Sequence, residues 1–237
     1  ILNGIDESIY DPRHDPYIEP YSEEDLSGKK ENKKRLQEQL HLNVEEHIPV
    51  IAIISRLTKQ KGLDLVKCVF HEIMQENVQL IVLGTGEAEF ERFFAEMENL
   101  YPKKVKAILE FNEEMAHRIY AGADLFLMPS KFEPCGLGQM IAMKYGTLPI
   151  VRETGGLNDT VQSYNEITKE GNGFSFRNFN AHDMLYTIRR ALSFYRQPDI
   201  RHELIKRALA ADNSWSHSAY QYNEMYADLL AGRESHV

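Results

Sequence analysis

The run IPVIAIIS at residues 48–55 decides the fold, because it is almost wholly apolar and short. Four further runs of the same kind follow it: VQLIVLG (78–84), VKAILEF (105–111), ADLFLMPS (123–130) and TLPIVRE (147–153). Such runs, apolar at successive positions, are typical of strands that are covered on both faces, as in a parallel sheet. Residues 174–176 (FSF) are predicted to form a last short strand.

The segments between these runs have the period of helices. Val66, Val69, Phe70 and Ile73 follow a 3.6-residue spacing, and a second such series runs from Met184 to Tyr195. Alternating strands and helices predict an α/β fold with a doubly wound, mostly parallel Rossmann-like sheet and helices on both faces. In such a sheet the ligand is expected at the carboxyl ends of the strands.

Composition excludes several classes of protein. The 237 residues include 27 Lys and Arg against 36 Asp and Glu, a formal net charge of −9, which argues against nucleic-acid and membrane-surface partners. No apolar run approaches the ~20 residues of a membrane helix. The two cysteines, Cys68 and Cys135, form no CxxC pair and no disulfide framework, which indicates a reducing compartment.

The chain divides into three segments by composition. Residues 1–47 are predicted to form an N-terminal arm and a surface helix, 48–214 a Rossmann-like domain, and 215–237 a C-terminal helix. The chain opens on the apolar segment ILNGID without a Met, so we expect a fragment of a longer protein.

Cations follow the first strand in SRLTKQKG (55–62). Arg56 and Lys61 leave the strand just before a helix, and Gly62 allows close approach, an arrangement suited to clamping a diphosphate. The alternative is that both are solvated loop cations, the commoner fate of such residues.

Glycines follow two other strands. VLGTGE (82–87) places Gly84 and Gly86 at a turn, but it lacks the third glycine of a dinucleotide fingerprint, so a tight turn without a ligand is favoured. RETGGLNDT (152–160) presents Thr154, Gly155 and Gly156, which are either a plain turn or a second backbone contact to ligand, with a slight preference for the ligand.

The stretch PSKFEPCGLGQM (129–140) is the most informative. Glu133 and Cys135 precede a helix that Gly136 and Gly138 open, and bare amides at a helix N-terminus suit phosphate. A carboxylate there favours a hydroxyl ligand such as a sugar. Cys135 is interpreted as a small packed side chain rather than a catalytic thiol.

Taken together, NGIDESIYDP (3–12), SRLTKQKG and the stretch from 129 to 161 resemble the bacterial glycogen synthases and plant starch synthases, which are retaining glycosyltransferases of the GT-B fold. The resemblance covers essentially the whole chain and corresponds to the carboxyl-terminal half of such an enzyme. It implies that residues 48–214 are the nucleotide-sugar-binding domain and that the catalytic partner domain is absent from this chain. It implies transfer of glucose from ADP-glucose to the non-reducing end of an α-1,4-glucan, in the bacterial cytoplasm or, in a plant, the plastid. The glucan would be bound mainly by the missing N-terminal domain.

The resemblance also implies roles for individual residues. Arg56 and Lys61 match the diphosphate-binding cations, and Glu133 matches an acidic residue that contacts the donor glucose; these three are the expected catalytic residues. Cys135 and the segment Gly136, Leu137 and Gly138 would bind the donor and its phosphates, with Gly84, Gly86, Thr154, Gly155 and Gly156 as possible further cleft residues. Where the wider GT-B group often has a second Glu, this chain has Ile141, so a paired-carboxylate mechanism is not carried over.

Neither a cofactor nor a metal is expected, because no DxD with flanking carboxylates is present and the cations perform a metal's electrostatic task. Two alternatives remain open. One is another GT-B transferase with a UDP- or GDP-sugar donor, and the other is a non-catalytic nucleotide-binding domain on the same sheet.

Overall fold

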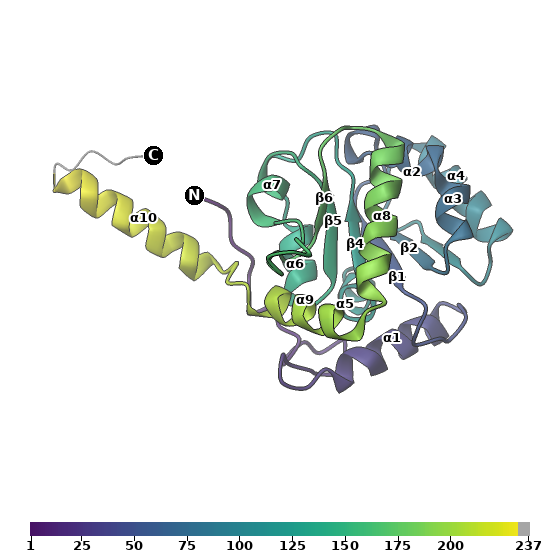
Figure 1. The fold of residues 1–237 in the computed structure, drawn as a ribbon, viewed down its shortest axis with the longest axis horizontal. Coiled ribbons are helices and arrows are strands. Elements are labelled where there is room, and N and C mark those ends of the chain that lie inside the picture. Colours follow the sequence, from purple (N-terminus) through teal and green to yellow (C-terminus); the bar gives the residue numbers. More distant parts are fainter. Residues whose placement is uncertain (232–237) are drawn as a thin grey trace.

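Parallel strands form the centre of the computed structural model, which describes residues 1–231 (Figure 1). Within that range six strands pair in the order β3-β2-β1-β4-β5-β6, and every neighbouring pair is parallel. The strands are β1 (Val50–Ile54), β2 (Gln79–Leu83), β3 (Val105–Ile108), β4 (Leu125–Met128), β5 (Leu148–Arg152) and β6 (Phe174–Phe176). Each lies inside an apolar run, so the predicted fold class is confirmed.

The strand order reverses direction at β1. Ile51 pairs with Leu80 of β2 on one side and with Leu125 of β4 on the other. The chain therefore winds outward first to β3, then crosses back and winds outward to β6. At such a switch point the loops that follow two adjacent strands separate and leave a crevice for ligand.

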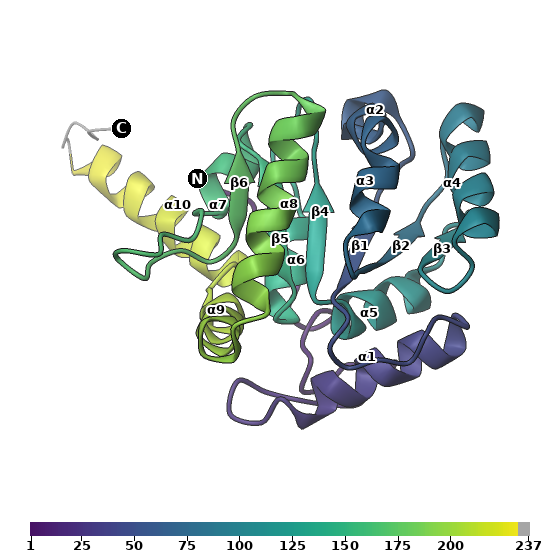
Figure 2. The same cartoon turned by 45° about the vertical axis from the view of Figure 1, so that its right-hand side comes forward.

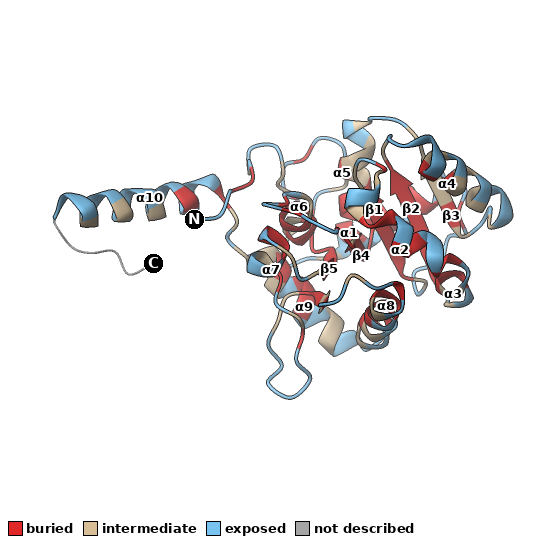
Figure 3. Ribbon diagram, turned by 90° about the horizontal axis from the view of Figure 1, so that it is seen from above, coloured by how far each residue is buried: buried red, intermediate tan, exposed pale blue. Residues whose placement is uncertain are grey.

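Helices cover both faces of the sheet. Figures 1 and 3 show α2, α3 and α8 on one face and α5 and α6 on the other. The helices are α1 (Ser27–Gln39), η1 (Lys59–Lys61, a 3-10 turn), α2 (Leu63–Cys68), α3 (Phe70–Gln75), α4 (Ala88–Leu100), α5 (Glu113–Gly122), α6 (Gly138–Lys144), α7 (Gly156–Thr160), α8 (Ala181–Tyr195), α9 (Pro198–Ala210) and α10 (Trp215–Leu230). In α8 the predicted apolar series is buried from Met184 to Tyr195.

The core lies between these layers. Every residue of β2 is buried, as are the first four residues of β1 and β5, which is why these sequences are apolar at every position except Gln79 (Figure 3). Alternation would have placed every second side chain in water. In contrast, Ser218 is the only residue of α10 that is buried, and this helix extends away from the sheet (Figure 1).

Helix α1 lies at the amino ends of the strands, beside α5 (Figure 2). Although its sequence is mostly charged, one side of it is buried, including Lys29 and Lys33. Lys29 Nζ lies within 3.2 Å of four oxygen acceptors: the carbonyls of Ala121, Ala123 and Tyr145, and Thr147 Oγ1. Burial lowers the pKa of Lys29 to about 7, with the carboxylate of Asp124 acting in the opposite direction.

The N-terminal arm is fastened to the body by polar side chains. His117 Nδ1 lies 2.7 Å from Asp15 Oδ2, and the hydroxyl of Tyr145 donates to the same oxygen. Although burial opposes the shift, these hydrogen bonds hold the pKa of Asp15 below its usual value. Ile5 forms a parallel bridge with Ser214, and its amide donates to the carbonyl of Asn213 at 2.8 Å, so the arm returns to the start of α10.

Candidate active site

An ion pair occupies the crevice where the strand order reverses. Lys61, which ends η1 after β1, donates from Nζ to Glu133 Oε2 at 2.5 Å, and Glu133 lies in the loop after β4. The two side chains are 17% and 11% exposed, so the pair is largely removed from solvent but still reachable. Ser130 Oγ donates to the same carboxylate oxygen at 3.0 Å. The structure therefore brings together two residues that are 72 positions apart in the sequence.

The loops that carry this pair are held to each other by backbone contacts. The amide of Lys131 donates to the carbonyl of Gln60 at 2.9 Å. Gly62 has φ of 72°, and a Cβ at this position would lie 2.0 Å from the carbonyl oxygen of Pro129. Only glycine permits both that conformation and that approach. The position of Lys61 relative to Glu133 is thus fixed by main chain on both sides.

The loop after β5 supports Glu133 from behind. The amide of Gly156 donates to the carbonyls of Glu133 and Pro134, both at 3.1 Å. A Cβ on Gly155 would lie 2.2 Å from the Glu133 carbonyl oxygen, and one on Gly156 would lie 1.8 Å from that of Cys135. Glycine is therefore required at both positions by the close packing of the two loops. Thr154 takes part in the same turn, because its carbonyl accepts the amide of Leu157.

The start of α6 faces the crevice with free amides. Within residues 1–231, the amides of Gly136 and Leu137 have no hydrogen-bond acceptor, and Gly136 adopts φ of 68°. Gln139 Nε2 holds this turn by donating to the carbonyl of Gly136 at 2.9 Å, while its Oε1 is buried without a partner among the described residues. Cys135 is exposed, not packed, which corrects the expectation of a small buried side chain.

A cavity of about 340 Å³ adjoins the crevice at the ends of β1, β2 and β3. Arg56 is exposed on its wall, next to Gly84. The phenyl ring of Phe111 is 90% exposed there, an unusual state for so large an apolar side chain. The remaining lining residues are Tyr10, Ile54, Ser55, Leu83, Thr85, Glu110, Asn112, Glu113, Ala116 and Tyr120.

The sequence analysis identified some of this cavity and missed the rest. Arg56 and Gly84 were candidates, whereas Phe111 and Tyr10 were not. The signal for Phe111 was present, since it ends the third apolar run and so follows a strand at the carboxyl edge. Gly86 lies beside this cavity and has a structural task, because a Cβ there would lie 2.3 Å from the carbonyl oxygen of Leu57.

Among residues 1–231, no group of three or more His, Cys, Asp and Glu side chains is arranged to hold a metal ion. No helix in the same range has the length and apolar character needed to cross a membrane.

Comparison with known proteins identifies the family. Residues 32–210 match the family described as glycosyl transferases group 1. The chain belongs to this family. The glycosyltransferase chain is 63% identical over 238 residues to the glycogen synthase of Anoxybacillus flavithermus, and 61% identical over 235 residues to that of Geobacillus stearothermophilus. These alignments cover 100% and 99% of the chain but 49% and 48% of the relatives.

Solved structures agree with this assignment. The catalytic domain of starch synthase IV from Arabidopsis thaliana, bound to ADP and acarbose, matches 96% of the glycosyltransferase chain with a TM-score of 0.89 at 38% identity. The chain covers 48% of that structure. The Anabaena protein HepE, in complex with UDP and glucose, shares the fold at 18% identity, with a TM-score of 0.68 over 96% of the chain. The glycosyltransferase chain thus spans about half the length of the relatives it matches and is similar to the carboxyl-terminal half of glycogen synthases.

Proposed function

We propose that this chain is the donor-binding half of a synthase that transfers glucose from ADP-glucose to the non-reducing end of an α-1,4-glucan, with retention at the anomeric carbon. The observation that carries the proposal is the Lys61–Glu133 pair at the sheet's switch point. Its support is the family assignment and the likeness to glycogen synthases and to a starch synthase structure that contains ADP.

In this proposal the site stabilises the two charges that develop during glucosyl transfer. Negative charge grows on the leaving diphosphate, where Lys61, Arg56 and the free amides of Gly136 and Leu137 act as preorganised donors. Positive charge grows on the anomeric carbon, where the carboxylate of Glu133 accepts glucose hydroxyls and favours oxocarbenium character. Lys61 contributes to both parts of the donor site because its ammonium group already contacts Glu133. A bound donor would place a phosphate oxygen and a glucose hydroxyl next to this one ammonium group.

The cavity beside Arg56 suits the nucleoside of the donor. The exposed ring of Phe111 offers a stacking surface for a base, and stacking of a base on an aromatic side chain is worth about 1–3 kcal/mol in nucleic-acid sites. Cys135 and Gly138 would lie near the glucose and phosphates, and the site would need neither a metal nor a cofactor.

The proposal includes a partner domain that contributes the acceptor site. Apolar side chains exposed at the carboxyl edge, Phe111, Phe132 and Leu137, support a surface that a second domain covers. We infer that the chain by itself transfers negligible glucose, because closure of two domains excludes water and completes such sites. Incorporation of glucose into glycogen by the isolated chain would contradict this inference.

The proposal is tested by calorimetric titration of ADP, UDP and ADP-glucose into the chain and two variants. Lys61→Ala should weaken ADP binding at least about tenfold, the scale of a charge-assisted hydrogen bond. Lys59→Ala is the matched control, because Lys59 belongs to the same 3-10 turn but is exposed. The ADP affinity of this variant should equal that of the unmodified chain.

Two results would favour the alternatives. Tighter binding of UDP than of ADP would indicate another donor. ADP binding that is indifferent to both Lys61→Ala and Arg56→Ala would indicate a non-catalytic nucleotide-binding domain.

A further inference from the structure

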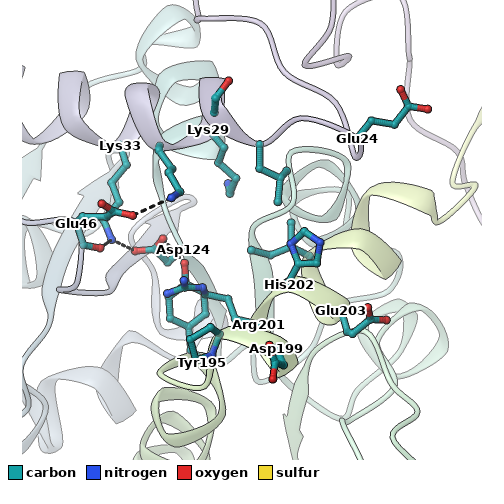
Figure 4. Close-up of a pocket in the computed structure, with 15 residues that line it drawn as sticks. Glu24, Lys29, Lys33, Glu46, Asp124, Tyr195, Asp199, Arg201, His202 and Glu203 are labelled. Carbon is teal, nitrogen blue, oxygen red and sulfur yellow. Dashed lines mark hydrogen bonds and ion pairs between the residues drawn. The ribbon is translucent and has the colours of Figure 1, made fainter.

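A second cavity lies at the opposite end of the sheet from the candidate active site. It has a volume of about 790 Å³, within the usual range of small-molecule sites. Asp124, on its wall, directly precedes β4, whereas Glu133 follows that strand. Helix α1, the turn at Glu46, the end of α8 and the first turns of α9 complete the walls (Figure 4). Its full lining is Glu24, Leu26, Ser27, Lys29, Lys30, Lys33, Glu46, Asp124, Tyr195, Pro198, Asp199, Arg201, His202, Glu203 and Ile205.

One part of this cavity is a buried hydrogen-bond network. Asp124 Oδ2 accepts from Lys33 Nζ and from the amide of Val50, both at 2.7 Å, and its Oδ1 accepts from the hydroxyl of Tyr195. Lys33 Nζ also donates to the carbonyl of Glu46 at 2.8 Å. Because every one of these groups is buried or engaged within the fold, this side supplies rigidity.

Other groups of the lining are still available to a ligand. The Arg201 guanidinium stacks over the ring of Tyr195, with its Cζ 5.3 Å from the ring centroid. Within residues 1–231 it has no hydrogen bond or ion pair, so its five N–H donors face the cavity and solvent (Figure 4). The carboxylate of Glu46, paired with Lys30 at 3.1 Å, is 57% exposed and can accept further hydrogen bonds.

The balance of charge selects the class of ligand. The lining carries four Lys and Arg side chains and five carboxylates, a formal net charge of −1 when Lys29 is counted as charged and His202 as neutral. A phosphate would meet that excess of carboxylates, whereas hydroxyl groups both donate and accept and so suit a wall of alternating sign. Leu26, Pro198 and Ile205 add apolar surface, which matches the C–H faces of sugar rings.

We propose that this cavity, between α1 and α9, binds a segment of neutral α-glucan at a distance from the site of transfer. The choice of α-glucan among neutral sugars rests on the proposed function. A glucan bound in this cavity would stay tethered while another of its branches is extended at the site of transfer. Tethering raises the effective concentration of glucan chain ends at that site without any new contact to the reacting atoms.

The test is titration of maltoheptaose into the chain in the presence of saturating ADP, which occupies the donor site. We expect saturable binding that Arg201→Ala weakens about tenfold or more, the scale of losing hydrogen bonds from a charged donor. Ser27→Trp, which places an indole at the exposed start of α1, should weaken it equally by filling the cavity. Arg196→Ala is the matched control, since Arg196 is exposed nearby but does not line the cavity.

Unchanged ADP affinity in all three variants shows that they are folded, because the donor site lies at the other end of the strands. Absence of maltoheptaose binding, or binding that Arg201→Ala and Ser27→Trp both leave intact, would overturn the inference. Competition by inorganic phosphate would overturn the assignment of a neutral ligand. Failure of ADP to bind the unmodified chain would instead count against the proposed function, so the two proposals fail separately.

Discussion

Strand β4 has a buried carboxylate paired with a lysine at each of its ends. At the amino end Asp124 meets Lys33 at 2.7 Å, with side-chain exposures of 6% and 8%; at the carboxyl end Glu133 meets Lys61 at 2.5 Å. Asp124 accepts three hydrogen bonds and Lys33 also contacts a carbonyl. Within residues 1–231, the Glu133 carboxylate accepts only from Lys61 and Ser130, and Lys61 Nζ has no other partner.

The difference lies in how completely the hydrogen-bonding capacity is used. A pair whose donors and acceptors are mostly engaged by the fold contributes to structure, and it has little left to offer a ligand. A pair with unused donors and acceptors is held in place by the fold, and a substrate can form the remaining hydrogen bonds. Burial alone does not separate these cases, because all four side chains are mostly buried.

The largest effect is expected when the amino-end pair, Lys33–Asp124, is broken. Lys33→Met leaves the Asp124 charge buried with fewer partners, and breaking a buried pair on one side typically costs about 3–5 kcal/mol. Urea denaturation should show a fall of that size in the free energy of unfolding. Lys30→Met is the control, because the Lys30–Glu46 pair is exposed and such pairs are worth about 0–1 kcal/mol. Equal losses in both variants would contradict the comparison.

Changing the carboxyl-end pair, Lys61–Glu133, should lower the free energy of unfolding less than Lys33→Met does, but it should lower the activity strongly. The protein for this test is a chimera in which the chain replaces the matching half of the Anoxybacillus flavithermus glycogen synthase. Lys61→Ala should remove about 2–4 kcal/mol of transition-state stabilisation, seen in kcat/KM, and so should Arg56→Ala.

The charge at Glu133 is tested in the same chimera. Glu133→Gln should lower kcat at least about 100-fold with an unchanged melting temperature and nearly unchanged ADP affinity. A variant that turns over normally and melts a few degrees lower would make Glu133 structural, like Asp124.

The smallest effect concerns the response of stability to pH at the amino end. The pKa of Lys29 is about 7 in the folded chain and near 10.5 in the unfolded chain, so between these values the unfolded state holds the extra proton. The free energy of unfolding should therefore rise from about pH 7 to 9, by at most about 1.4 kcal/mol per pH unit. The window ends there because tyrosines ionise near pH 10 when unfolded, whereas burial raises the pKa of Tyr145 and Tyr195 in the fold. Lys29→Met should flatten this rise, and an equal slope in both chains would exclude Lys29 as its source.

The fold was predictable from sequence because its strands are buried on both faces. The run at 48–55 contains β1 and the run at 78–84 contains β2, since continuous apolar side chains leave few other solutions. The positions of candidate residues followed from the same rule, because Arg56, Lys61 and Glu133 lie in the segments that follow strands. That step needed only the order of residues along the chain.

Contacts across the fold were not predictable in the same way. No local pattern indicates that Lys61 and Glu133 touch, because their meeting depends on β1 and β4 being neighbours. Charged residues in α1 suggested a surface helix, yet Lys29 and Lys33 are buried, because acceptors from distant loops surround them. The exposed state of Phe111 was equally hidden, since an aromatic residue that ends an apolar run is more often packed in a core.

The bridge between Ile5 and Ser214 has a consequence for protein engineering. Leu2 accepts a hydrogen bond from Ser218 Oγ at 2.8 Å, so the chain enters and leaves the body of the domain at one place. A unit whose entry and exit adjoin is easily inserted into a surface loop of a host protein, and its ends can be joined by a short linker. The α/β body can thus be handled as a cassette, with new termini opened in an exposed loop far from both ends of β4.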